Sequence, residues 1–264
     1  MVFLNSNQQL ITDTHAHLYY PGIINDIEEI LSRAGDAGIE RIIVPAVDLD
    51  TSRIILKMSE KYDMIYCALG VHPCDVNKNE FSVIDELEKL LNHEKVVAIG
   101  ETGLDYYWDK SNIEKQKSFF KLQIELAKSF NLPIIIHTRD SVDDAIEMIK
   151  VNCDQHLRGQ FHCFSGNAEH LNKILSLKNF YVSYCGNITY KNFNGADIVN
   201  ITPEERLLSE TDSPFLPPVP YRGKENEPAH IIHTLVKISE IKNVELKILL
   251  KSINKNVNEL FFRI

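Results

Sequence analysis

Histidine and carboxylate side chains recur in short motifs along this chain, and their spacing is typical of metal ligation. The first motif contains His15 and His17, which are separated by one residue. Side chains of an extended strand repeat every two residues, so both imidazoles would point to the same side and could bind one ion. Such a pair is weak evidence for a metal site when it stands alone. The other motifs must therefore decide whether it belongs to a site.

Five further motifs with potential metal ligands follow in chain order: Gly70-Val-His72-Pro, Gly100-Glu101-Thr-Gly-Leu-Asp105, His137-Thr-Arg139, His162-Cys-Phe-Ser-Gly166 and Glu210-Thr-Asp212-Ser-Pro. Of the ten histidines, five thus lie at or just beyond expected strand ends. A single histidine is more often a satisfied core residue or a polar surface group, but a set at one rim is typical of a metal site. We expect the ligands to be His15, His17, Glu101, His137, His162 and Asp212.

The chemistry of these ligands indicates which ions they would bind. Four imidazoles with two carboxylates suit Zn²⁺, Mn²⁺ or Fe²⁺, whereas Mg²⁺ prefers more oxygen ligands and water. Six ligands are too many for one tetrahedral ion, so we expect two divalent ions about 3.5–4 Å apart with Glu101 as the bridge between them. Two such ions and two carboxylates leave a local charge of about +2, which would attract a phosphodiester.

Several neighbouring side chains could contact that substrate. Arg139 could bind a phosphate through its fork of donors, and His72 is a candidate proton donor or phosphate contact. Arg222 and Lys224 lie in the long loop after the last expected strand, where a solvated charge is an equally good interpretation. The residues Tyr106, Tyr107 and Trp108 could stack on unpaired bases, or form a hydrophobic lid over the site.

The elements that must position these motifs alternate along the chain. Short apolar runs predict strands at Leu10–His15, Arg41–Val47, Met64–Val71, Lys95–Gly100, Pro133–His137, Gly159–His162, Tyr181–Tyr184 and Arg206–Glu210. Amphipathic stretches predict helices near 24–37, 51–62, 81–92, 112–130, 141–151, 168–177, 194–201, 227–240 and 244–262. Eight strands alternating with helices predict a parallel (β/α)₈ TIM barrel, an α/β fold whose active site lies at the carboxyl ends of the strands.

Composition sets the broad class of this protein. The chain has 264 residues, with 28 Lys and Arg against 37 Asp and Glu, and a formal net charge of −9. This acidic balance argues against tight sequence-independent binding of duplex nucleic acid. Its five cysteines include no CxxC pair, and neither a signal peptide nor an apolar run of membrane-spanning length is present. We expect one cytoplasmic domain over residues 1–264. We expect it neither to associate with a membrane nor to need an obligate protein partner.

Taken together, the motifs resemble those of the TatD family of metal-dependent deoxyribonucleases, a branch of the metallo-dependent hydrolase barrels. The pattern also includes Asp13-Thr-His15-Ala-His17 and Arg222-Gly-Lys-Glu-Asn226-Glu-Pro228, and it spans about four-fifths of the chain. The resemblance implies that His15, His17, Glu101 and Asp212 bind one ion and that Glu101, His137 and His162 bind the other. It also implies Mg²⁺-supported exonuclease activity on DNA, with RNA as a substrate of some relatives. Thr102 and Ser141 depart from the usual residues of this pattern.

The function expected from the residues and the resemblance is hydrolysis of phosphodiester bonds at single-stranded or frayed DNA ends. Water activated by two metal ions would be the nucleophile, Asp212 would be both ligand and base, and Arg139 or His72 would stabilise the transition state. The alternative is a binuclear amidohydrolase or lactonase acting on a small molecule. Many such enzymes resemble this barrel but bridge their ions with a carbamylated lysine, where this chain has Glu101. A barrel that binds a partner without catalysis is a third hypothesis.

Overall fold

Eight parallel strands form a single sheet, in the computed structural model that describes residues 10–108 and 110–263. Each strand pairs with the next one along the chain, so the spatial order is the sequence order. The strands are β1 (Ile11–Asp13), β2 (Ile39–Pro45), β3 (Ile65–Leu69), β4 (Val96–Asp105), β5 (Ile134–Arg139), β6 (Gly159–Phe161), β7 (Phe180–Tyr184) and β8 (Leu207–Ser209). The predicted (β/α)₈ TIM barrel is therefore confirmed.

The barrel closes just beyond the carboxyl ends of β1 and β8. The amide of Asp212 donates a hydrogen bond to the carbonyl of His15 at 2.8 Å. The amide of His17 donates to the carbonyl of Ser213 at 2.7 Å, and Ala16 forms a parallel bridge with Ser213. The segments that close the barrel thus carry three of the expected metal ligands.

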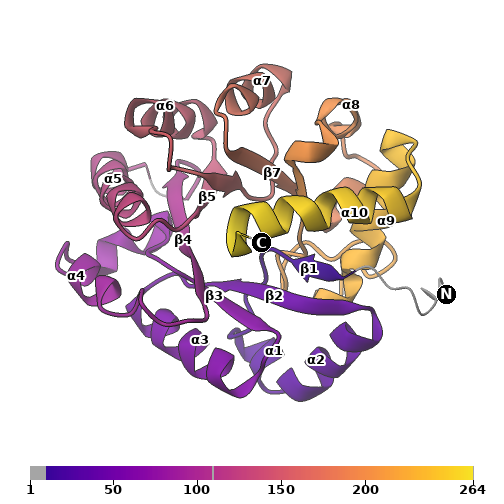
Figure 1. The fold of residues 1–264 in the computed structure, drawn as a ribbon, viewed down its shortest axis with the longest axis horizontal. Helices are drawn as coiled ribbons and strands as arrows, with labels where there is room; N and C mark the ends of the chain where they lie inside the picture. The colour runs from indigo at the N-terminus through magenta and orange to yellow at the C-terminus, as the bar shows by residue number, and fades with distance from the viewer. Residues whose placement is uncertain (1–9, 109, 264) are drawn as a thin grey trace.

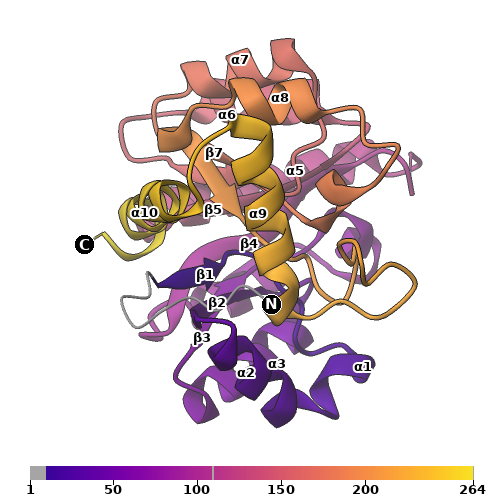
Figure 2. The same ribbon diagram turned by 90° about the vertical axis from the view of Figure 1, so that its right-hand side faces the viewer.

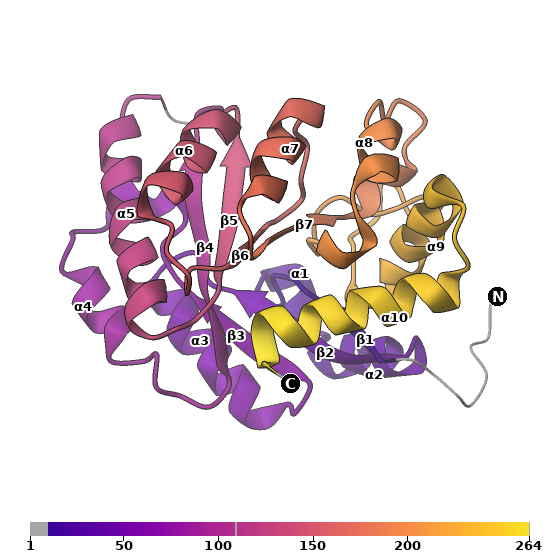
Figure 3. The same ribbon diagram turned by 45° about the horizontal axis from the view of Figure 1, so that its top comes forward.

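Helices surround the sheet, as Figure 1 shows. They are α1 (Pro21–Ile24), α2 (Ile27–Asp36), α3 (Leu49–Lys61), α4 (Val83–Glu88), α5 (Ile113–Ser129), α6 (Val142–Asn152), α7 (Ala168–Ser176), α8 (Ala196–Ile201), α9 (Ile231–Lys242) and α10 (Leu246–Val257). In Figure 3, α5, α6 and α7 stand in succession outside the sheet. Among the described residues, we find no helix with the length and apolar character needed to cross a bilayer.

Helix α10 lies across the amino-terminal end of the barrel. The side chain of Asn256 donates to the carbonyl of Glu204, just before β8, and to the carbonyl of Leu207, the first residue of β8. Figure 2 shows α10 on one side of the barrel and the long loops after β7 and β8 on the other. This helix covers one mouth of the barrel and leaves the carboxyl ends of the strands for the site.

Several predicted boundaries differ from the structure. The helix expected over 24–37 is divided into α1 and α2, and the one expected over 81–92 is shortened to α4. The fourth strand was expected to end at Gly100, yet β4 continues to Asp105. Its register with β5 shifts between Ile99 and Thr102, a bulge of the kind found beside active sites. Glycine is common in turns, but Gly103 lies within β4, where it lets the backbones of β4 and β5 approach closely. A Cβ atom at this position would lie 2.2 Å from the carbonyl oxygen of His137.

A buried glutamine fixes α5 to the ends of β3 and β4. The Gln123 side chain accepts a hydrogen bond from the Val71 amide at 2.8 Å and donates to the Val71 carbonyl at 3.1 Å. It also donates to the hydroxyl of Thr102 at 2.6 Å. Thr102, where the resemblance leads us to expect an aliphatic residue, therefore has its polar atom satisfied.

Replacing Gln123 with leucine should destabilise the barrel by about 3 kcal/mol, because two backbone groups of Val71 and one hydroxyl lose their buried partner. Urea unfolding measures the change in the free energy of unfolding. Replacing Ser118, an exposed residue of the same helix, with alanine is the control and should cost little. Equal stability of the two variants would contradict the role given to Gln123.

Candidate metal centre

All six expected ligands lie at the carboxyl-terminal end of the barrel. His15 and His17 follow β1, Glu101 lies within β4, and His137 lies within β5. His162 follows β6 directly, and Asp212 follows β8. Parallel strands of a closed barrel direct their carboxyl ends to one mouth, so residues nearly 200 positions apart in the chain come together.

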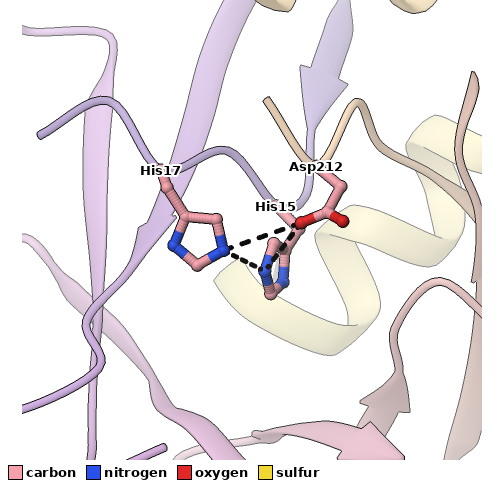
Figure 4. Close-up of side chains that lie close together, drawn as sticks. All are labelled: His15, His17 and Asp212. Carbon is pink, nitrogen blue, oxygen red and sulfur yellow. Dashed lines mark hydrogen bonds and ion pairs between the residues drawn. The ribbon is translucent and has the colours of Figure 1, made fainter. Parts of the chain in front are cut away.

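The first group consists of His15, His17 and Asp212 (Figure 4). The Nε2 atoms of the two imidazoles lie 3.1 Å apart. Each lies 3.6 Å from Asp212 Oδ1. Three potential ligand atoms therefore face a common centre, although the short β1 ends at Asp13 and strand alternation alone does not produce this arrangement.

The second group consists of His137 and His162, and Glu101 lies between the two groups. Glu101 Oε1 is 2.9 Å from His137 Nδ1 and 2.8 Å from His162 Nε2. Its other oxygen, Oε2, is 3.3 Å from His15 Nε2 and 3.5 Å from His17 Nε2. The two oxygens of one carboxylate thus face different sets of imidazoles.

These residues fit a pair of divalent ions by the chemistry of their donor atoms. Imidazole nitrogens and carboxylate oxygens are ligands of Zn²⁺, Mn²⁺ and Fe²⁺. Glu101 is buried, and among the residues in the described part of the chain no lysine or arginine forms an ion pair with Glu101 or Asp212. A buried carboxylate needs a cationic partner, and only protonated imidazoles or bound cations can provide one here.

In the metal-free protein, the pKa values of Glu101 and His162 shift in the directions that favour an ion pair between them. Burial opposes ionisation of Glu101, but the charges of His162, His72 and His15 outweigh it and hold the Glu101 pKa well below its ordinary value. Burial likewise opposes protonation of His162, yet its attraction to Glu101 raises the His162 pKa well above the ordinary value. A divalent ion that binds His162 must therefore displace a proton.

Metal binding should accordingly release protons near neutral pH and strengthen as the pH rises. The sign follows from the raised pKa values of His137 and His162, since the proton is the competitor of the cation. Calorimetric titration with Mn²⁺ in two buffers of different ionisation enthalpy measures the number of protons released. Identical heats in both buffers would contradict this prediction.

Asp105 is part of the centre, although we did not predict a role for it from the sequence. Its Oδ2 lies 3.0 Å from His137 Nε2, so His137 is left with Nδ1 for Glu101 and a metal ion. Burial raises the pKa of Asp105, but hydrogen bonding to His137 prevails and lowers it to about 2. The even spacing from Glu101 was an available signal, because both residues lie on β4 once the strand is extended to its true end.

Replacing Asp105 with asparagine should weaken metal binding by about 10- to 100-fold, because Asp105 fixes the ring orientation and basicity of His137. Equilibrium dialysis against Mn²⁺ measures the affinity, and activity should return at high metal concentration. The control is Asp63→Asn, at an aspartate outside the site that precedes β3. Unchanged metal affinity in Asp105→Asn would refute this positioning role.

Two further buried carboxyl groups support the centre and were also missed. Asp13 accepts hydrogen bonds from the amides of His15 and Thr211, and burial raises its pKa to about 8. Glu210 Oε1 accepts from the amide of Cys163 at 2.6 Å and lies 3.6 Å from His162 Nδ1. Both belong to motifs that the sequence analysis singled out, but nothing in the linear pattern distinguishes a supporting carboxylate from a ligand.

The residues expected to contact substrate lie in two different environments. His72 belongs to the cluster, since its Nε2 is 3.5 Å from Glu101 Oε1. Arg139, Tyr106 and Arg222 form no hydrogen bond or ion pair with the six expected ligands over the described ranges. The Tyr106 hydroxyl donates to Asp144, and the Arg222 guanidinium lies over the ring of Tyr190. The structure therefore brings His72 to the centre, whereas the side-chain contacts of Arg139, Tyr106 and Arg222 are with residues other than the six expected ligands.

Comparisons with known proteins identify the family of this chain and proteins with the same fold. The sequence pattern of the family described as TatD related DNase matches residues 12–262. An uncharacterized metal-dependent hydrolase, YabD of Bacillus subtilis, is 42% identical over 96% of this chain and 99% of its own length. The crystal structure of YjjV, a TatD homolog of Escherichia coli, has a TM-score of 0.91 at 30% identity and covers 96% of this chain and 98% of its own. A hydrolase TatD family protein of Entamoeba histolytica has a TM-score of 0.88 at 26% identity, with 97% and 99% covered.

Proposed function

This chain belongs to the family of TatD related DNases and is a metal-dependent hydrolase, and from this premise we propose that it hydrolyses phosphodiester bonds of DNA. The proposal includes an exonucleolytic mode at single-stranded or frayed ends. RNA is a second polynucleotide of the same chemistry. The candidate metal centre is the site at which we place the reaction.

One observation carries the proposal: the two oxygens of Glu101 face two separate groups of imidazoles. Two cations held by one bridging carboxylate are the arrangement that stabilises both the attacking and the leaving oxygen of an in-line displacement at phosphorus.

The donor atoms suggest which residues hold each ion. His15, His17, Glu101 and Asp212 would hold one ion, and Glu101, His137 and His162 would hold the other. When bound, the two ions would supply Lewis acidity to the phosphoryl group and lower the pKa of the attacking water. The chemistry of the remaining steps belongs to side chains of this protein.

Asp212 is the residue we assign as proton acceptor. Its side chain is 12% exposed, whereas that of Glu101 is 3% exposed, so Asp212 is the more accessible carboxylate of the centre. Burial raises the Asp212 pKa, but hydrogen bonding to His17 and the charge of His15 keep it below the ordinary value, so the carboxylate is ready to accept a proton. We assign His72, whose Nε2 lies 3.5 Å from Glu101 Oε1, as the group that donates a proton or a hydrogen bond to the substrate.

The proposed preference for ends follows from charge. With a net charge of −9, the protein as a whole disfavours the many phosphate contacts that binding of a long duplex requires. A terminal, unpaired nucleotide needs few phosphate contacts and can enter a barrel mouth. Activity that rises on long duplexes and withstands high salt would contradict this part of the proposal.

The test is digestion of end-labelled single-stranded DNA by the purified protein, with Mg²⁺, Mn²⁺ and Zn²⁺ compared and a chelator as control. Release of mononucleotides supports an exonuclease, whereas internal fragments refute the end preference. Parallel panels of amides and lactones address the binuclear amidohydrolase alternative. Turnover of those compounds without cleavage of DNA or RNA under any metal would refute the proposed function.

A further inference from the structure

An exposed aromatic pair lies beside an arginine just outside the candidate metal centre. The side chains of Tyr107 and Trp108 are large and apolar, yet the residues are 54% and 68% exposed. Their rings meet edge to face with centroids 5.1 Å apart. The guanidinium carbon of Arg139 lies 3.9 Å from the Tyr107 ring centroid and 5.3 Å from that of Trp108. We call Tyr107, Trp108 and Arg139 the aromatic–arginine platform.

The platform is joined to the candidate metal centre through one carboxylate. Asp105 Oδ1 accepts hydrogen bonds from the amides of Tyr107 and Trp108, both at 2.9 Å. Its Oδ2 lies 3.0 Å from Nε2 of His137. Arg139 lies two residues after His137 on β5, and its carbonyl accepts from the amide of Tyr106 at 2.8 Å. The backbone of the platform is thus fixed relative to a candidate metal ligand.

We propose that the aromatic–arginine platform binds an unpaired nucleobase and the phosphate next to it, and so places a strand end in the candidate metal centre. This inference rests on the proposed function and names the part of the substrate that is recognised beyond the scissile phosphate. Exposed rings provide a stacking surface for any base. A guanidinium beside them provides charge for a phosphate and a planar group of its own for stacking.

Charge and position favour this occupant over an apolar one. Of the described ion pairs, none includes the guanidinium of Arg139, whose contacts are with the faces of the two aromatic rings. An apolar ligand would leave that charge desolvated without a counterion, whereas a nucleotide supplies a phosphate beside its base. The carboxyl ends of β4 and β5 carry both the platform and ligands of the centre, so a single strand could reach both.

The chain carries its own probe for this proposal, because Trp108 is the sole tryptophan. We would titrate the full-length protein, in chelator to prevent cleavage, with an oligothymidylate of about eight nucleotides, a length within the usual range of single-strand sites. Stacking should quench the Trp108 fluorescence with saturation. An oligomer of the same length without bases should require about tenfold higher concentration to reach half-saturation of the protein. Oligouridylate distinguishes RNA from DNA as the source of the base.

Two variants keep the fluorescent reporter and remove its neighbours. Tyr107→Ala and Arg139→Ala should each raise the dissociation constant of the oligothymidylate about tenfold, with the circular dichroism spectrum unchanged. The matched control is Arg41→Ala, since Arg41 also stacks on an aromatic ring, Phe262, at 4.2 Å, but at the amino-terminal end of the barrel. The control should bind as the unchanged protein does.

The outcomes separate this inference from the proposed function. Equal quenching by the oligomers with and without bases, or unchanged binding by both variants, would overturn the platform and favour a hydrophobic lid. Cleavage of a small phosphodiester without a base, such as bis(4-nitrophenyl) phosphate, by the metal-loaded unchanged protein tests the centre alone. Absence of that cleavage, together with no cleavage of polynucleotides, would refute the proposed function and leave the binding result standing.

Discussion

Replacing Glu101 with glutamine is expected to reduce metal-dependent hydrolysis about a thousandfold, because the variant loses the charge of the carboxylate whose two oxygens face both sets of imidazoles. Its two oxygens lie 2.8 Å from His162 Nε2 and 3.3 Å from His15 Nε2. Glutamine has the same shape but carries no charge, so the barrel should fold. We expect the bound metal to fall from two ions to one or none, as elemental analysis of the dialysed protein measures.

A second readout separates loss of charge from loss of structure. The charge of Glu101 counteracts burial and raises the His162 pKa, so that pKa should fall in the variant, as NMR titration of the metal-free protein would show. The matched control is Glu60→Gln, since Glu60 also lies beside an imidazole, His93 at 3.7 Å, but on the surface away from the centre. A Glu101→Gln protein that keeps two ions and near-normal turnover would defeat the assignment.

Replacing Asp212 with asparagine is expected to lower kcat by about a hundred- to a thousandfold, because the variant loses both an ionic ligand and the proposed proton acceptor. Asparagine is the appropriate substitution, since the Asp212 backbone has φ of 57° and asparagine tolerates this left-handed conformation. If Asp212 accepts the proton of water, KM should change far less than kcat. Steady-state kinetics with saturating metal measures both parameters.

The matched control for this variant is Asp140→Asn. Asp140 also has a left-handed backbone, with φ of 54°, and it follows β5 on the exposed rim without contacting the six ligands. Its replacement should leave kcat and thermal stability close to those of the unchanged protein. If Asp212→Asn retained kcat at saturating metal, the proton would have to go to another group.

The sequence predicted the architecture well because the pattern that indicates each strand and helix is local in the chain. Alternation of apolar strands with amphipathic helices requires only residues that are near in the chain, and eight repeats of this alternation are typical of one fold. The boundaries were less accurate where local and tertiary preferences conflict. In β4, Gly100 and Gly103 favour a turn, yet pairing with β5 extends the strand to Asp105.

The identity of the candidate ligands also depended mainly on the sequence. Side-chain type and position at a strand end define which groups can reach one mouth, and the structure brings the other five candidates close to Glu101 or to the imidazoles beside it. The supporting carboxylates could not be chosen in this way. Asp105, Asp13 and Glu210 differ from ligands only in which nitrogen or amide they face, and that depends on rotamers and on strands that meet in space.

Sequence by itself thus determined the barrel, the family resemblance and the set of candidate metal ligands, because these follow from residue type and periodicity. Tertiary structure alone decided that Tyr106 is bonded to Asp144 while Tyr107 and Trp108 face Arg139. Consecutive aromatic residues look equivalent in a sequence. Their exposure and partners are set by packing against other strands and helices, through contacts between residues far apart in the chain.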